Sequence, residues 1–158
     1  MRFWFDTEFI EDGKTIELLS IGILAEDGRE YYAEPAEALS HFDRADPWVK
    51  ENVISHLTGV TKPRKWIADE IVQFVGDKPE FWAYYADYDW VVLCQLYGRM
   101  IDLPKGWPMF CRDVKQLCVD LGNPTLPQQT STEHHALQDA IWTRQAWDFL
   151  QIKKDLAA

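Results

Sequence analysis

Two acidic side chains lie close together near the start of the chain, in the stretch FDTEF. Residues 2–9 are rich in aromatic residues and predict a strand, on which side chains two positions apart share one face. Asp6 and Glu8 would therefore project together, about 7 Å apart along the strand. Two such acids repel each other and lose hydration, and a divalent cation would remove this conflict. A solvated strand surface carries the same pattern, so this pair alone leaves both interpretations open.

A second acidic pair, Asp87 and Asp89, lies in the stretch YADYDW, between a predicted strand and a predicted helix. An aspartate at a helix start often accepts hydrogen bonds from the free N–H groups of the first turn. Asp89 has helical spacing with Leu93 and Leu96, so it shares the face that carries these leucines into the core. A carboxylate on a buried face needs a partner. We therefore assign Asp87 to capping and Asp89 to a site.

The third place is the stretch HHALQD, at the start of a long predicted final helix. Asp139 lies on a stripe of this helix that is flanked by small residues, which would allow a close approach to the sheet. Two histidines, His134 and His135, come before it. On a continuous helix His135, four residues before Asp139, would be its nearer neighbour, so spacing alone favours His135.

The four assigned acids can converge on one edge of a sheet, because they come from one strand and from two helix starts. Oxygen ligands in this number suit Mg²⁺ or Mn²⁺ rather than Zn²⁺. Two ions held by shared carboxylates are typical of in-line displacement at phosphorus. The four predicted metal ligands are Asp6, Glu8, Asp89 and Asp139.

Composition narrows the class of protein. The chain has 158 residues, the size of one compact domain, and 47% of them are hydrophobic. We expect a single domain over residues 1–158, with no transmembrane helix and no signal peptide. The net charge of −10 argues against a protein that coats nucleic acid by bulk electrostatics. Three cysteines, an odd number, favour a cytoplasmic location over a disulfide framework.

Hydrophobic periodicity and turn signals predict three strands joined by hairpins, followed by helices that alternate with two further strands. This order implies an α/β fold with a five-stranded mixed sheet, an antiparallel meander at one side and helices on both faces. The predicted strands are residues 2–9, 16–26, 29–35, 80–85 and 107–113. The predicted helices are residues 47–57, 65–76, 89–100, 113–122 and 135–156.

The stretches FDTEF, YADYD and HHALQD, taken in this order, resemble the three motifs of the DEDDh 3′–5′ exonucleases, a superfamily with a ribonuclease H-like fold. One position departs from the common pattern, because Tyr85 stands where an asparagine usually lies, four residues before Asp89. Small size, acidic charge and the stretch PWVKENVISHL are also similar to the bacterial exoribonuclease called ribonuclease AS, a relative of ribonuclease T. The resemblance covers nearly the whole chain.

The resemblance implies that the four acids bind two metal ions and that His134 is the general base. It also implies single-stranded RNA 3′ ends as substrate, a preference for adenylate tails, nucleoside 5′-monophosphates as products, and a homodimer. The motif selects His134 although spacing favours His135. The two agree if the final helix begins at about His135, so that His134 belongs to the loop before it.

Phe9, next to Glu8, is a candidate for stacking on the terminal nucleotide, and a core aromatic at the strand end is an equal alternative. Two other functions stay open. One is a 3′–5′ DNA exonuclease of the proofreading or repair type. The other is a binding module that has the fold and no catalysis, which the complete set of acids and histidine disfavours.

Overall fold

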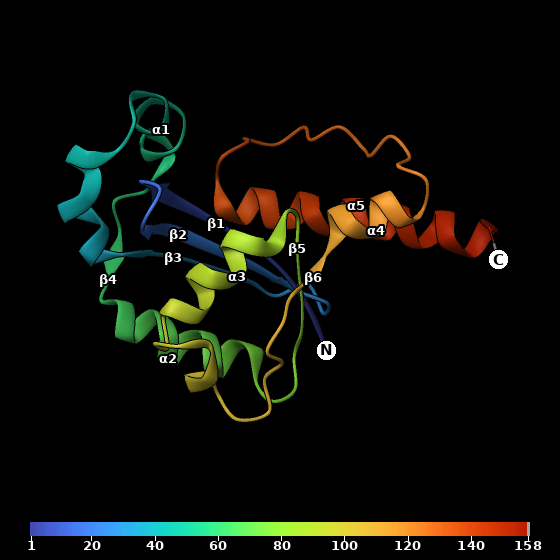
Figure 1. Cartoon of the computed structure of the whole chain (residues 1–158), viewed down its shortest axis with the longest axis horizontal. Helices are drawn as coiled ribbons and strands as arrows, with labels where there is room; N and C mark the ends of the chain where they lie inside the picture. Colours follow the sequence, from blue (N-terminus) through green and yellow to red (C-terminus); the bar gives the residue numbers. More distant parts are fainter. Residues whose placement is uncertain (158) are drawn as a thin grey trace.

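The computed structural model describes residues 1–157; Ala158, the last residue of the predicted domain, lies outside this range. A mixed sheet with strand order β4-β3-β2-β1-β5-β6 forms the centre, and helices cover both of its faces (Figure 1). The α/β prediction is therefore confirmed. The strands are β1 (Arg2–Glu11), β2 (Ile16–Ala25), β3 (Glu30–Pro35), β4 (Thr61–Lys62), β5 (Glu80–Ala83) and β6 (Arg112–Asp113).

The sheet has six strands, so the prediction of five was wrong by one. The additional strand, β4, lies between the predicted helices 47–57 and 65–76, where no strand was predicted, and it pairs in parallel with the end of β3. Two residues are too few to show an alternating pattern, and their partners lie far away in the sequence. Of the predicted strand 107–113, only the two residues of β6 form a strand in the structure.

The helices largely follow the predicted spacing. The predicted helix 47–57 divides at Val53 into α1 and the short 3₁₀ segment η2, and the predicted helix 89–100 lies earlier, as α3. None of the helices within residues 1–157 is long and apolar enough to cross a membrane. The helices are α1 (Pro47–Asn52), α2 (Arg64–Val75), α3 (Ala86–Gln95), α4 (Val114–Asp120) and α5 (Ala136–Ala157), with 3₁₀ segments η1 (Ala36–Arg44), η2 (Ile54–His56) and η3 (Met100–Asp102).

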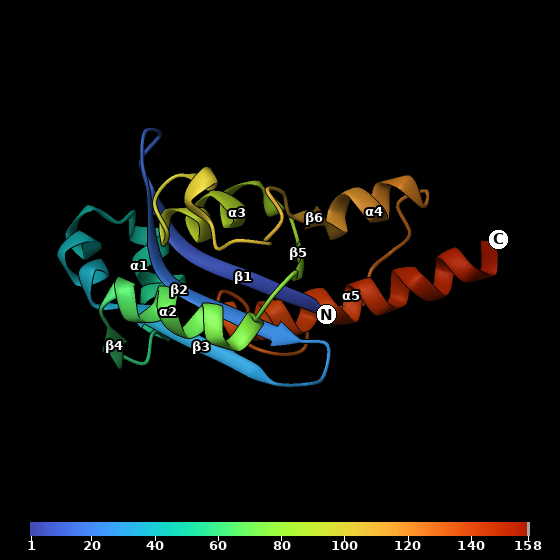
Figure 2. The same cartoon turned by 90° about the horizontal axis from the view of Figure 1, so that it is seen from below.

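Strand β1 is central over only part of its length. It pairs antiparallel with β2 from Phe3 to Glu11, but in parallel with β5 only from Arg2 to Trp4. Within residues 1–157 no other strand pairs with β1 on the β5 side beyond Trp4. The second half of β1 therefore presents an open edge, and α3, which follows β5 directly, lies beside it (Figure 2).

The two faces of the sheet are covered differently. An aromatic and aliphatic core fills the space between the sheet and the helices α2 and α3, and Phe3, Phe5 and Phe81 are its largest strand residues. Helix α5 runs along the opposite face (Figure 1), where Trp147 packs edge-on against Trp4 at 5.3 Å. Residues of β1 that point away from the aromatic core therefore point toward α5.

Helix α5 approaches the sheet most closely at Gly22. A Cβ atom at this position would collide with the backbone of Ala136 and Leu137, in the first turn of α5. Gly22 pairs with Asp6 across the β1–β2 ladder. The absence of a side chain at Gly22 thus brings the start of α5 over the acidic part of β1, and with it Asp139.

Candidate active site

The predicted acids converge at the open edge of β1. Asp6 and Glu8 come from β1, Asp89 from the first turn of α3 and Asp139 from the first turn of α5. All four line one cavity of about 280 Å³, together with the ring of His134. The positive ends of two helix dipoles point toward this cavity and favour carboxylates there.

Glu8 and Asp6 lie in surroundings that disfavour their charged forms. The side chain of Glu8 is only 9% exposed. Burial, followed by the charge of Asp139 and a hydrogen bond with it, raises the pKa of Glu8 to about 8. Desolvation, and then repulsion from Asp89, Glu8 and Asp139, holds the pKa of Asp6 well above its usual range. These two residues therefore behave as parts of one acidic cluster rather than as a solvated strand surface.

The buried carboxylate of Asp89 has a hydrogen-bond partner, Thr7. The backbone N–H and the hydroxyl of Thr7 both donate to Oδ1 of Asp89, at 2.8 and 2.6 Å. Thr7 lies in the part of β1 beyond β5, where an α3 side chain replaces a neighbouring strand as acceptor. Burial raises the pKa of Asp89 to about 7, although the hydrogen bonds from Thr7 oppose the shift.

The assignment of Asp87 as the cap of α3 was wrong. Asp87 is exposed, and the N-cap position belongs to Tyr85, whose φ of 56° is left-handed. The carboxylate of Asp113, from β6, accepts the N–H groups of Tyr85 and Ala86 at 3.3 Å each. Asp113 also caps α4 through the N–H of Lys115. A cap supplied by a neighbouring strand leaves no local signal in the helix sequence.

Asp139 is held through both of its carboxylate oxygens. Oδ2 accepts the backbone N–H of His134 at 3.0 Å, and Oδ1 accepts the side-chain amide of Gln129 at 2.5 Å. Burial raises the pKa of Asp139, and these two hydrogen bonds act in the opposite direction. Sequence reasoning did not single out Gln129, because it lies in an irregular loop with no periodicity and no motif.

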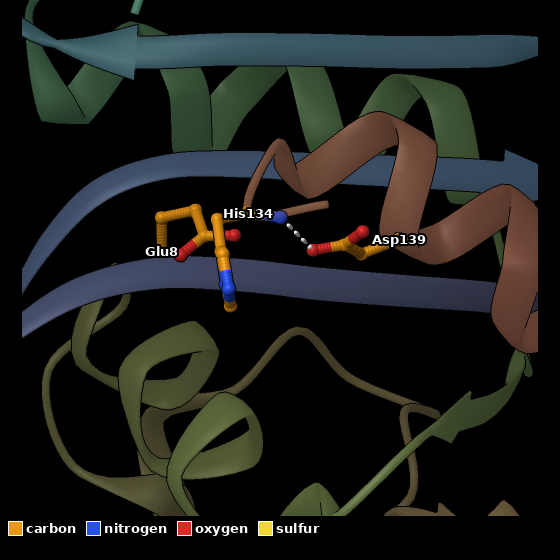
Figure 3. A group of neighbouring side chains, drawn as sticks. All are labelled: Glu8, His134 and Asp139. Carbon is orange, nitrogen blue, oxygen red and sulfur yellow. Dashed lines mark hydrogen bonds between the residues drawn. The ribbon is translucent and has the colours of Figure 1, made fainter. Parts of the chain in front are cut away.

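His134 and His135 have separate environments. Helix α5 begins at Ala136, so the prediction of a helix start near His135 is confirmed. His134 lies before the helix with a left-handed φ of 61°, and Figure 3 shows its backbone N–H facing Asp139 and its ring beside Glu8. The ring of His135 instead stacks on Tyr32 at 4.7 Å, and its carbonyl accepts the N–H of Asp139.

The segment formed by α1 and η2 makes a wall beside His134. The ring of Trp48 meets that of His134 edge-on at 4.9 Å, while Trp48 itself remains 52% exposed. Nδ1 of His56 lies 3.4 Å from the carbonyl oxygen of His134. The sequence indicated helical spacing for this segment and nothing that linked it to the acids, because the contacts join residues more than 70 positions apart.

Phe9 lies at the rim of the same cavity. Its ring packs edge-on against Tyr88 at 5.7 Å, and both residues line the cavity with Tyr84 and Tyr85. Phe9 also contacts the core on the α3 face, as the alternative of a core aromatic requires, while stacking on a nucleotide stays a prediction. Aromatic rings in such a place offer surfaces on which nucleobases can stack.

The donor set fits a divalent cation. Glu8, His134 and Asp139 each offer a ligand atom, and these atoms lie within 4.8 Å of one another. Asp6 and Asp89 add further oxygens in the same cavity. Burial raises the pKa values of Glu8 and Asp89, and a bound cation would favour the charged forms of both carboxylates.

The one tight basic cluster, residues 62–65, is engaged with acidic side chains. Its ion pairs are Lys62 with Glu70 at 2.7 Å, Arg64 with Glu17 at 3.4 Å, and Lys65 with Asp69 at 2.9 Å. These cations compensate local acids.

The arrangement of the elements is similar to that of part of exonuclease I. Exonuclease I superposes with a TM-score of 0.61 at 16% identity, over 94% of this chain and 40% of that chain. The zinc-bound form of the E. coli exonuclease I complex with single-stranded DNA also gives 0.61, at 12% identity, over 98% of this chain and 40% of that chain. At such low identity the likeness concerns the fold alone, and the chain spans less than half of these larger enzymes.

Sequence comparison defines the family. Residues 1–151 match the family described as the 3′-5′ exoribonuclease Rv2179c-like domain. The 3′-5′ exoribonuclease Rv2179c of Mycobacterium tuberculosis strain H37Rv is 45% identical over 150 residues, which cover 89% of this chain and 87% of the relative. The corresponding protein of strain CDC 1551, MT2234.1, matches equally. The chain belongs to the Rv2179c-like 3′-5′ exoribonuclease family, and its resemblance to the 3′–5′ exonucleases is thereby confirmed.

Proposed function

We propose that this protein is a metal-dependent 3′–5′ exoribonuclease that shortens single-stranded RNA from its 3′ end and acts as a single domain. The observation that carries the proposal is the convergence of four carboxylates and one loop histidine in a cavity at the open edge of β1. Membership of the family supports RNA as the substrate and the 3′–5′ direction.

Asp6, Glu8, Asp89 and Asp139 would hold two Mg²⁺ or Mn²⁺ ions, since carboxylate oxygens are the ligands that these cations prefer. When bound, such ions stabilise the charge that develops on the phosphate and lower the pKa of bound water. Without them the same carboxylates repel one another: after burial, the charges of Asp139 and Asp89 raise the pKa of Glu8.

His134 has the role of general base. A water molecule attacks the phosphorus of the last phosphodiester, and its proton passes to a ring nitrogen of His134. The bond from phosphorus to the 3′ oxygen breaks, and this oxygen takes up a proton from solvent. The products are a nucleoside 5′-monophosphate and a strand with a new 3′-hydroxyl. His134 suits this role because its loop position brings the ring beside Glu8 and Asp139, and because imidazole titrates near neutral pH.

Phe9 and Tyr88 would hold the terminal base by stacking, since both rings line the cavity beside the acids. Similarity to ribonuclease AS supports a preference for adenylate tails and a homodimer. Three free cysteines, two of them buried, support a cytoplasmic location. Competition between adenylate and uridylate tails tests the base preference, and light scattering after gel filtration tests the dimer.

The deciding experiment compares end-labelled RNA and DNA of matched sequence, each with a free or a phosphate-blocked 3′ end. We expect hydrolysis of RNA from a free 3′-hydroxyl in Mg²⁺ or Mn²⁺, release of 5′-monophosphates, and complete loss in EDTA that added metal reverses. Equal rates on DNA would contradict the RNA assignment. Cutting of a circular strand would identify an endonuclease. Full activity after chelation would exclude the metal-dependent mechanism.

A further inference from the structure

One loop supplies the donors to both oxygens of Asp139. The loop joins α4 to α5, and Figure 1 shows it arching along α5 back to the first turn of that helix. Gln129, near its middle, donates to Oδ1, and His134, at its end, donates through its backbone to Oδ2. The carboxylate that would bind a cation and the imidazole that would take the proton are therefore tied to the same segment.

The loop is fastened to α5 at one further point. The indole N–H of Trp142, on α5, donates to the carbonyl oxygen of Pro127 at 2.9 Å. Between this contact and His134, the hydrogen bond from Gln129 to Asp139 joins a loop side chain to α5. Ser131 lies 3.3 Å from the Gln129 amide nitrogen and belongs to the loop itself. Gln129 is thus placed to hold the part of the loop that leads to His134.

We infer that Gln129 is a positioning residue that couples cation binding by Asp139 to the placement of His134. This inference rests on the proposed function. Its amide fixes the rotation of the Asp139 carboxylate from one side, while the N–H of His134 fixes it from the other. A carboxylate oxygen carries two lone pairs, so Oδ1 can accept from Gln129 and still face a cation. A partner of this kind typically changes metal affinity or activity by about 10–100-fold when it is removed.

Gln129 has a matched control in its neighbour. Gln128 is exposed, whereas Gln129 is partly buried against Asp139. Gln129→Met retains the length of the side chain and removes its N–H donors, and Gln128→Met makes the same chemical change one residue away. Comparison of the two variants therefore isolates the hydrogen bond to Asp139 from any general effect of a methionine in this loop.

The first test is Mn²⁺ binding by calorimetry on the full chain without RNA, so that the readout is independent of turnover. We expect Gln129→Met to weaken Mn²⁺ binding by about 10–100-fold and Gln128→Met to leave it unchanged. Gln129→Asn keeps the donor on a shorter side chain and should lie between Gln129→Met and the wild type. Equal Mn²⁺ affinity in Gln129→Met and the wild type would overturn the inference.

The second test is amide hydrogen exchange of residues 130–134 in the metal-free protein. We expect faster exchange in Gln129→Met, with α5 beyond the first turn unchanged, because the loop has lost its hold on Asp139. Unchanged exchange in these residues would overturn the role in placing His134. Failure of the wild type to bind Mn²⁺ or to hydrolyse RNA would instead overturn the proposed function, so the two failures are distinguishable.

Discussion

Two buried glutamates on the same sheet show opposite ways of keeping a carboxylate away from water. Glu34, in β3, is only 2% exposed, and its oxygens accept four hydrogen bonds. These come from the hydroxyl of Tyr32 at 2.8 Å, from the N–H and hydroxyl of Thr58 at 2.6 and 2.9 Å, and from the N–H of Gly59 at 2.9 Å. Donors surround this carboxylate and fasten the loop after η2 to β3.

Glu8, in β1, is nearly as buried but faces other acids instead of donors. Burial raises the pKa of Glu8 to about 8, and the neighbouring charges of Asp139 and Asp89 act in the same direction. The contrast separates a structural carboxylate from one arranged for binding. The carboxylate of Glu34, surrounded by donors, stabilises the fold, while the carboxylate of Glu8, surrounded by acids, is placed where a bound cation would neutralise it.

Glu8→Gln should break this contrast most strongly. We expect turnover to fall by about 10³-fold or more, because a ligand whose charge stabilises the reaction by several kcal/mol is lost. The metal-free variant should also be more stable than the wild type, since repulsion with Asp139 is relieved. Rate assays and thermal unfolding in EDTA check both. Asp87→Asn is the control for charge, because Asp87 is exposed and should change neither quantity much.

His134 lines the same cavity as the acids, and its replacement tests its role as general base. His134→Ala should lower turnover by about 10²–10⁴-fold, the usual effect of losing a general base. Its pH–rate profile should lose the ascending limb near neutral pH that we expect for the wild type. His135→Ala should have a small effect on turnover, because that ring stacks on Tyr32 away from the acids. An inactive His135→Ala variant together with an active His134→Ala variant would move the role of general base to His135.

Glu34→Gln should change stability rather than turnover. The new amide group brings N–H donors against the N–H groups of Thr58 and Gly59, so one of these donors loses its acceptor. Because Thr58 and Gly59 are themselves exposed, we expect the free energy of unfolding to fall by about 1 kcal/mol, measured by urea denaturation. Glu30→Gln, at the exposed start of the same strand, is the control. A stabilised Glu34 variant would mean that the two glutamates are alike.

The pH dependence of the metal-free protein sharpens the contrast further. Glu8, with a pKa raised by burial from 4.5 to about 8, keeps its proton in the folded state and loses it on unfolding. Unfolding therefore releases protons between these values, and stability falls as pH rises through this window, by up to about 1.4 kcal/mol per pH unit. Asp89, whose pKa burial raises to about 7, adds to the same trend.

Thermal unfolding in EDTA across this range measures the slope, and Glu8→Gln should flatten it. Added Mn²⁺ should raise stability most at the alkaline end, where ionised carboxylates bind the cation best. A metal-free wild type that becomes more stable between about pH 5 and pH 8 would contradict the raised pKa values.

The parts of the site that local periodicity controls were predictable from the sequence. A period of two placed Asp6 and Glu8 on one face of β1, and helical spacing placed Asp89 on an inward face. The choice of His134 over His135 came from the motif, and the left-handed backbone before α5 accounts for it.

The parts that distant contacts control were not predictable. Gln129, Trp48 and Asp113 act on residues from other elements, and these distant contacts leave no periodic pattern in the sequence around them. The two-residue strand β4 was missed for the same reason. The role of Gly22 was not predictable either, because it depends on the close approach of α5, which is distant in the sequence.

The ion pairs of the basic cluster have a consequence for the thermodynamics of RNA binding. A protein that neutralises phosphates with its own free lysines and arginines releases condensed counterions, and its affinity falls steeply with salt. Lys62, Arg64 and Lys65 are already paired with acids, and the chain carries a net charge of −10. The affinity for a short single strand should therefore depend only weakly on monovalent salt at saturating divalent metal, and a plot of log affinity against log salt measures this slope.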